Sequence, residues 1–487
     1  MLCSAIAVGS AAGISSVSGD GAEGDFFEDD SMPDDEFFED DFIDEEFIEE
    51  FSGTEERATE TDSQEETALQ KQIASEGKVL NIECWDEEFK SRVIEYYPGY
   101  EVIDGSTGKI GEITVEWHIT PEADNAYQNY LDSVLLGNDE TPEDDRIDLF
   151  LVEDDFAAKY FNSYVSLPLS EIGIEESELS EMYDYTKQLA EDEDGNLCGV
   201  TWQCWPGVLI YNRQAAIDTW GTDDPDEVQK HVSNWDEFMT SAGELSDKGY
   251  YITASAYDTY SAYASDIDVP WVSADNQVQI RSSLENWAQN SCSLVRNGCT
   301  TTADLWSEEW CKGLMQDGNV FCYFGAAWMI EYGLSSDLTD SIGSIGGWGV
   351  CAGPQQYFSR GTWLCAAYGT DNPSLVADIM RKMTTDEGIL QSLLTRDGDF
   401  VNNRSVMAEA ADDDRFSLNV LGGQNPVSIY MECAEVLDAS SVTPYDIYCD
   451  EQFKEEMRLY FEGSDSYEEA VNAFQKAITG RFEELTA

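Results

Sequence analysis

The chain has 487 residues, a hydrophobic content of 42% and a formal net charge of −75 at pH 7. Its length exceeds what one hydrophobic core usually serves and suits two lobes of roughly 150–200 residues each. The negative charge excludes nucleic acid and anionic lipid surfaces as partners, because both would be repelled. Its two histidines, His118 and His231, lie far apart in the sequence, which disfavours a histidine-rich metal centre, and no cofactor is expected.

The N-terminal residues 1–24 contain a short apolar run, residues 2–14, which no basic residue precedes. This run is shorter than the roughly 20 residues that a membrane-spanning helix needs, and it is typical of a secretory signal whose basic start is missing. A cleaved signal is favoured over a lipid anchor at Cys3, because the preceding Leu2 is bulky. We expect an exported protein, extracellular or at the cell surface, with membrane tethering left open.

Residues 25–77 are expected to form an acidic, disordered linker. Three acidic and aromatic blocks, DFFEDD, DEFFEDD and DFIDEEFIEE, fill its first half. Their like charges repel one another and cannot pack into a core. A surface tether is favoured, although the pairs Phe26–Phe27 and Phe37–Phe38 could also contact a partner.

The cysteines do not have the paired spacing of a zinc site. Twelve are present, and none forms a CxxC motif. Several lie in apolar runs, such as Cys322 and Cys365, where a buried free thiol is the default. The pair Cys292 and Cys299 is the best candidate if a disulfide exists.

The folded part begins near Lys78 with alternating strands and helices. Hydrophobic periodicity predicts strands over 78–85, 111–120 and 146–156, with helices over 86–100 and 122–137. This order predicts a mostly parallel sheet covered by helices, whose ligands bind outside the carboxyl ends of the strands. Cys84–Trp85 and Glu153–Asp154–Asp155 therefore fall at the mouth of a predicted cleft.

The second half also contains predicted strands and helices, in a less regular order. A turn at Asp194–Gly195 leads into strands and then, from residue 213, helices, with Ser233 or Asn234 as a helix cap. The predicted elements that follow are a helix over 281–296, a strand and glycine turn in 317–333, a strand in 346–354, a strand from 362, a helix over 372–383 and mainly helix from 401.

Five segments in this order resemble the extracellular solute-binding proteins of ABC importers, specifically the carbohydrate-binding group that includes maltose-binding protein. They are PGYEV (98–102), IDLFLVEDDFAAKYFNSYVSLPLSEIG (147–173), DEDGNLCGVTWQCWPGVLIYNRQAAIDTWG (192–221), LWSEEWCKGLMQDGNVFCYFGAAWM (305–329) and GTWLCAAYGTDNPSLVADIMRKMTTDEG (361–388). The resemblance covers most of 78–487. It implies a two-lobed periplasmic-binding-protein-like α/β fold with hinge-linked lobes, a carbohydrate ligand (an oligosaccharide rather than one sugar), a membrane permease as partner, a monomer and no enzymatic activity.

The resemblance also implies how the chain is divided. The first lobe would comprise residues 78–190 and, after the chain returns, 355–400. The second lobe would comprise residues 191–354 and a C-terminal helical part, 401–487.

Sugars present flat C–H patches, which aromatic rings contact, and hydroxyl groups, which carboxylates, amides and guanidinium groups bind. On this basis, the fold that the resemblance implies gives ten candidate ligand contacts. For several of them, core packing or a salt bridge is the simpler interpretation. The ten candidates are Trp85, Tyr127, Glu153, Asp154, Trp202, Trp205, Trp328, Arg360, Trp363 and Asn425.

Two other functions remain open from the residues alone. A cationic solute such as a polyamine would also use aromatic rings and acids, and it would account for the acidic composition. A secreted glycoside hydrolase needs two carboxylates at a suitable separation, which some pair among 100 acidic residues will always satisfy.

Overall fold

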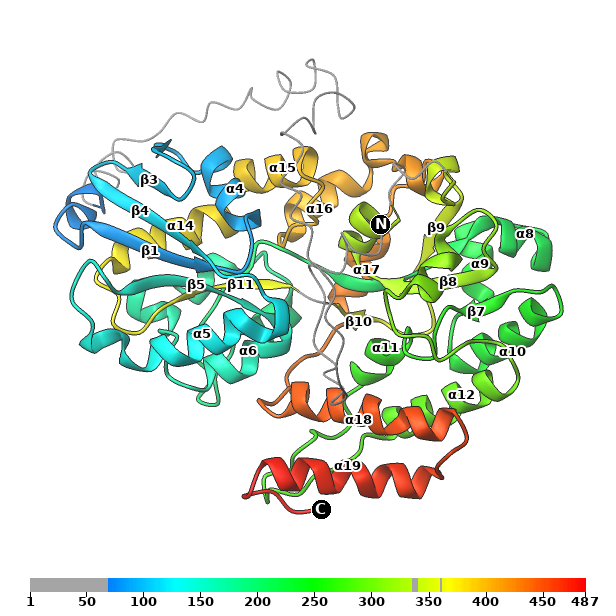
Figure 1. Ribbon diagram of the computed structural model, residues 1–487. Coiled ribbons are helices and arrows are strands. Elements are labelled where there is room, and N and C mark those ends of the chain that lie inside the picture. Colours follow the sequence, from blue (N-terminus) through cyan, green and yellow to red (C-terminus); the bar gives the residue numbers. More distant parts are fainter. Residues whose placement is uncertain (1–68, 335–339, 360) are drawn as a thin grey trace, which may run out of the picture.

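The computed structural model describes residues 69–334, 340–359 and 361–487. The chain forms two α/β lobes side by side, each built on one sheet (Figure 1). The first sheet has six strands in the order β11-β5-β1-β4-β3-β2, and the second has five. The predicted two-lobed α/β fold is confirmed. The signal-like segment and residues 25–68 of the predicted linker lie outside the described residues.

Three parallel strands form the centre of the first sheet: β1 (Val79–Cys84), β4 (Ile113–Ile119) and β5 (Ile147–Glu153). At one edge β11 (Thr362–Ala366) runs antiparallel to β5. At the other edge, β3 (Thr107–Ile110) and β2 (Tyr100–Val102) are antiparallel additions. The β-α-β-α-β order predicted from residue 78 is confirmed.

Helices cover both faces of this sheet because β5 is apolar on both sides. Leu149 and Leu151 of β5 point into one hydrophobic core, and Phe150 and Val152 point into another. The first core is closed by α4 (Glu88–Tyr96), α14 (Pro373–Thr385) and α15 (Glu387–Arg396), and the second by α5 (Ala126–Val134) and α6 (Asp154–Phe161).

The second sheet centres on β6 (Pro206–Asn212). Its neighbours are β8 (Val320–Gly325), β9 (Trp348–Cys351) and β10 (Tyr357–Phe358), all antiparallel to it, and β7 (Tyr251–Thr253) runs parallel to β8. The surrounding helices include α8 (Arg213–Trp220), α9 (Pro225–His231), α10 (Trp235–Ser246), α11 (Tyr260–Ala264), α12 (Ser282–Arg296) and α13 (Glu308–Cys311). Asn234, one of the two predicted caps, accepts a hydrogen bond from the Glu237 amide at 3.0 Å.

The C-terminal part is mainly helical, as predicted. Helices α16 (Arg404–Ala411) and α17 (Val427–Glu435) lie between the lobes, whereas α18 (Asp446–Phe461) and α19 (Tyr467–Arg481) pack together below them (Figure 1). The last two helices share an aromatic core with α12, and a buried ion pair between Arg281 and Asp446 fixes α18 to the loop before α12.

Three segments connect the lobes. The chain leaves the first lobe before Pro206, where β6 begins, and returns between Phe358 of β10 and Thr362 of β11. It leaves again near Val401, which forms a bridge with Gln203 of the first connection. The Ser359 amide of the second connection donates to the Trp205 carbonyl of the first at 3.1 Å, so the three connections run close together at the boundary of the lobes.

The structure corrects the predicted C-terminal end of the linker. Residues 69–77 were expected to be disordered, but residues 69–73 are helical and the segment is attached to the first lobe. The carboxylate of Glu76 accepts hydrogen bonds from the amide and the hydroxyl of Ser374, at 3.0 and 2.6 Å. The amide of Gly77 donates to the carbonyl of Asp371 at 2.9 Å. The prediction failed because these partners lie about 300 residues away in sequence, as the Glu76–Ser374 separation of 298 shows.

The cysteines of the described part are free thiols, and all except the half-buried Cys311 are buried. Cys292 and Cys299, the disulfide candidate, are not bonded, so the free-thiol interpretation holds. Among the described helices, none combines the length and the apolar composition that crossing a membrane requires.

Candidate functional site

The strand register brings the carboxyl-end edges of the two sheets to the boundary of the lobes. Glu153, the last residue of β5, pairs with Thr362, which directly follows the second connection. In the other lobe Gly325, the last residue of β8, pairs with Val208 near the start of β6, just after the first connection. Because β1 is parallel to β5 and β7 is parallel to β8, the carboxyl ends of all four strands lie at the lobe boundary, where α/β proteins bind ligands.

On the first lobe, Trp85 follows β1 and is half-buried. Its ring meets Tyr127 edge to face, with 5.5 Å between the ring centroids. Burial raises the pKa of the neighbouring Asp86, and the Glu122 carboxylate adds to this shift. Glu153 ends β5 half-buried, and Asp154 begins α6, where its amide donates to the carbonyl of Gly361 at 3.1 Å. An aromatic ring and several carboxylates thus share one edge of the first lobe.

Trp205 lies on the first connection. Its amide donates to the hydroxyl of Tyr185 at 3.1 Å, and its carbonyl accepts a hydrogen bond from the Ser359 amide at 3.1 Å. The backbone of Trp205 is therefore held by the first lobe and by the returning connection, while its side chain remains half-buried.

On the second lobe, three tryptophans form a connected group. Trp306 lies 5.8 Å from Trp328, which follows β8, and 4.5 Å from Trp310, measured between ring centroids. Trp306 and Trp328 are half-buried, whereas Trp310 is buried. The backbone of Trp306 adopts a left-handed φ of 64°, which is uncommon for a bulky residue and is often found at functional sites. We call these three residues the aromatic wall.

Sequence reasoning missed Trp306, Trp310 and the buried Asp258. The signal was available in LWSEEW, a segment whose serine caps α13: the Ser307 hydroxyl accepts a hydrogen bond from the Trp310 amide at 3.3 Å. Helix spacing alone suggests that the two tryptophans share a face, but their proximity to Trp328 depends on tertiary packing.

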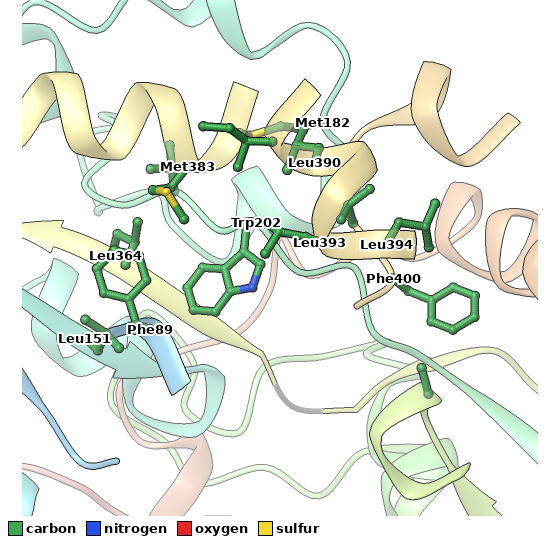
Figure 2. Packing of buried hydrophobic residues seen from close by; sticks show 14 of the residues in the cluster. Phe89, Leu151, Met182, Trp202, Leu364, Met383, Leu390, Leu393, Leu394 and Phe400 are labelled. Carbon is green, nitrogen blue, oxygen red and sulfur yellow. The ribbon is translucent and has the colours of Figure 1, made fainter. Parts of the chain in front are cut away.

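Trp202 and Trp363 lie in hydrophobic cores and not on an open surface. Each is only 1% exposed. Trp202 stacks on Phe89 at 5.4 Å among Met182, Met383 and Leu390 (Figure 2). The other core surrounds Trp363, whose indole N–H donates to the carbonyl of Thr186 at 3.0 Å. A large aromatic residue at the end of a strand can pack in the core or contact a ligand, and Trp202 and Trp363 pack in the core.

Tyr127 and Asn425 use their polar groups within the protein. The buried Tyr127 hydroxyl lies 3.0 Å from the carbonyl of Glu83 and 2.9 Å from that of Leu151. The Asn425 side-chain amide donates to carbonyl groups at the end of α16, including Ala410 at 3.0 Å, and its oxygen accepts the Val427 amide at 3.0 Å. Both residues thus connect elements of the fold. Arg360, the remaining candidate, lies outside the described residues.

Two hollows lie near the connections, and none of the nine described residues among the sequence-predicted contacts lines them. One, of about 710 Å³, is bounded by Tyr183, Ala352, Arg404 and residues of α17; the other, of about 310 Å³, is bounded by Asp266, Ile267 and Asp438. Both contact Gln356 and Val436. They border the lobe boundary without containing the aromatic wall.

Two buried carboxyl groups belong to the ends of the parallel strands. Burial raises the pKa of Glu83, the penultimate residue of β1, to about 7, although a hydrogen bond from Tyr130 opposes the shift. Burial likewise raises the pKa of Asp258, beyond the end of β7, to about 7. Within the described ranges, no group of three or more His, Cys, Asp or Glu residues is arranged to hold a metal ion.

No protein-family model matches the sequence, and a comparison of the sequence with curated proteins finds no match. Solved structures are similar. A crystal structure of an extracellular solute-binding protein of family 1 aligns with a TM-score of 0.67 at 15% identity, covering 82% of this chain and 99% of that one. The galacto-N-biose/lacto-N-biose I-binding protein of an ABC transporter from Bifidobacterium longum aligns with a TM-score of 0.62 at 15% identity. This alignment covers 84% of this chain and 100% of that one.

A third structure is the ABC-transporter-associated binding protein from B. animalis subsp. lactis Bl-04, solved with β-1,6-galactobiose. It aligns with a TM-score of 0.58 at 18% identity, covering 84% of this chain and 99% of that one. Nearly the whole length of each of these proteins is matched, so the likeness extends over both lobes and their connections. The chain has the two-lobed fold of the extracellular solute-binding proteins of ABC transporters.

Proposed function

We propose that this chain is an exported solute-binding protein that captures a carbohydrate, an oligosaccharide, between its lobes and delivers it to the membrane permease of an ABC importer. The observation that carries the proposal is the set of half-buried tryptophans at the lobe boundary: Trp85, Trp205, Trp306 and Trp328. They come from both lobes and from a connection between them. Indole faces suit the C–H patches of sugar rings.

The carboxylates beside these rings supply the polar half of a sugar site. Glu153 and Asp154 stand at the end of β5, where their oxygens can accept hydrogen bonds from hydroxyl groups. Arg360, which lies outside the described residues, is retained as a candidate donor. Trp202, Trp363, Tyr127 and Asn425 are not part of the proposed site, because packing or internal hydrogen bonds already occupy them.

The similar proteins support a sugar as the ligand. Two of them were solved with disaccharides, β-1,6-galactobiose and lacto-N-biose. Since their identity to this chain is low, the choice of sugar is open. In this role the chain binds its ligand without converting it. It acts as a monomer, and its lobes close on the ligand by motion at the three connections.

Thermal unfolding of the full chain with a panel of mono- and oligosaccharides tests the proposal. A ligand that binds only the native state stabilises it by about 2.7 kcal/mol at a hundredfold excess over Kd. The matched control for Trp328→Ala is Trp220→Ala. Trp220 is also half-buried, but it lies on the outer helix α8, stacked on His231 at 4.3 Å. We expect a shift with at least one glycan, lost in Trp328→Ala and kept in Trp220→Ala.

Spermidine and an aryl-glycoside complete the panel. A shift with spermidine and none with any glycan would replace the sugar by a cationic solute. Hydrolysis of the aryl-glycoside would contradict the binding role.

A further inference from the structure

Asp258 lies behind the aromatic wall and is 9% exposed. It belongs to the turn after β7, and because β7 and β8 are parallel, this turn lies at the same sheet edge as Trp328. One carboxylate oxygen accepts the amide of Ser255 at 2.7 Å, and the other accepts the indole N–H of Trp310 at 2.7 Å.

Among the described residues, no lysine or arginine forms a hydrogen bond or an ion pair with this carboxylate, and burial raises its pKa. Elsewhere in the molecule the buried acids Asp399 and Asp446 are hydrogen-bonded to Arg92 and Arg281. Burying a carboxylate without a cationic partner costs folding free energy, which its hydrogen bonds offset only in part, so we look for a role of Asp258 at the neighbouring site.

The partner of Asp258 supports the exposed face of the wall. The Trp310 ring packs between Trp306, at 4.5 Å, and Tyr323, at 4.7 Å. The Tyr323 hydroxyl donates to the Trp310 carbonyl at 3.2 Å. Trp306 in turn contacts Trp328. A hydrogen bond fixes the rotation of the Trp310 indole, and a fixed indole limits the orientations that Trp306 can adopt.

We propose that Asp258 is a positioning residue: by binding the indole N–H of Trp310, it holds the Trp306 ring at the angle that a sugar face requires. This inference rests on the proposed function, in which Trp306 and Trp328 contact the sugar. Asp258 itself does not touch the ligand in this account.

Four variants test the role: Asp258→Asn, Asp258→Leu, Trp310→Phe and the double variant Asp258→Leu/Trp310→Phe. Asn retains an acceptor, Leu removes it, and Phe removes the donor while keeping a ring. The matched control is Trp287→Phe, which removes the indole N–H that donates to Ala256 at 3.2 Å in the separate aromatic core of the same lobe. The measurements are the Kd of the glycan that binds wild type, by calorimetry, and thermal unfolding of every variant.

We expect Asp258→Leu and Trp310→Phe each to weaken glycan binding by about tenfold, and the double variant to be no weaker than either, because all three break the same contact. Asp258→Asn keeps one acceptor oxygen, which can bind the Trp310 N–H, whereas its NH2 group then faces the Ser255 amide. We therefore expect this variant to lose stability while its Kd stays within about threefold of wild type. Trp287→Phe should alter stability and leave Kd unchanged.

Affinity within twofold of wild type in a folded Asp258→Leu protein would overturn the inference, as would additive losses in the double variant. Equal losses in Asp258→Leu and Trp287→Phe would also overturn it, because they would indicate a general effect of destabilisation. If wild type binds no glycan, the proposed function itself fails, and the inference fails with it. If wild type binds a glycan and Asp258→Leu binds it equally well, only the inference fails, so the two failures can be distinguished.

Discussion

Glu153 and Thr362 are register partners across β5 and β11, so the last residue of one strand lies beside the first residue of the other. This pairing joins two parts of the chain that are far apart in the sequence. It puts the carboxyl end of β5 next to Gly361, whose carbonyl accepts a hydrogen bond from the Asp154 amide, and thus next to the boundary with the second lobe. A ligand held at this strand end can contact both lobes at once, which is the geometry that a hinged binding protein needs.

Trp363→Ala and Trp328→Ala should differ in stability. Trp363 is buried in a core and donates a hydrogen bond, so its loss should reduce the free energy of unfolding by about 3–5 kcal/mol. Trp328 is half-buried, and its loss should cost clearly less. Urea unfolding of both variants measures the difference. Equal losses would contradict the assignment of Trp363 to the core and Trp328 to a surface.

Most of the fold could be predicted from the sequence, because it depends on local patterns. The continuous apolar run of β5 and the strand–helix alternation from Lys78 specify the first sheet, and the Asn234 cap fixes the start of α10. The site was harder to predict. Trp202 and Trp328 follow similar turn-rich segments, yet only tertiary packing decides that Trp202 stacks on Phe89 while Trp328 stays half-buried.

The buried partners of a site leave even less trace in the sequence. Asp258 looks like any polar turn residue, because Trp310, which it binds, lies 52 residues away. The segment at 69–77 shows the same limitation: its composition is that of a linker, but Ser374 and Asp371 hold it in place. Long-range hydrogen bonds of this kind follow from the fold and cannot be read from local composition.

Glu83→Gln should change how stability depends on pH. The folded-state pKa of Glu83 is raised from 4.5 to about 7. Protonated Glu83 therefore favours folding: its contribution is fully present below pH 4.5 and is lost as the pH rises through 7. Wild type should lose about 2 kcal/mol from this group between pH 5 and pH 8, whereas Gln, which does not ionise, should lose none.

Urea unfolding at pH 5 and pH 8 measures this effect as a difference between the two proteins. The free energy of unfolding of Glu83→Gln minus that of wild type should be larger at pH 8 than at pH 5. The matched control is Glu101→Gln, which removes an exposed carboxylate on the edge strand β2. A pH-independent difference for Glu83→Gln would show that Glu83 titrates at an ordinary pKa.

Arg281→Met should destabilise the C-terminal helices. Arg281 is buried, paired with Asp446, and its guanidinium also donates to the carbonyl of Ala264 at 2.8 Å. Removing one partner leaves a buried charge uncompensated, which costs about 3–5 kcal/mol. Hydrogen exchange should show faster opening of α18 and α19 than of the first sheet. Unchanged protection of α18 would contradict this account of how it is anchored.

Asn425→Ala should loosen the junction of α16 and α17 without affecting ligand binding. Its side chain satisfies backbone carbonyls at the end of α16 and the amide of Val427. Leaving these groups unpaired should cost about 1–3 kcal/mol. Thermal unfolding should reveal the loss, and glycan Kd should remain within twofold. A selective loss of affinity at unchanged stability would return Asn425 to the list of ligand contacts.

The most direct test of the central claim is calorimetric titration of the full chain with the glycan that shifts its unfolding midpoint, repeated for Trp306→Ala, Trp328→Ala and the outer control Trp220→Ala. We expect saturable binding by wild type and Trp220→Ala, with affinity reduced at least about tenfold in Trp306→Ala and Trp328→Ala, because each of these loses a stacking face. Binding that survives in both wall variants would contradict a sugar site at the lobe boundary.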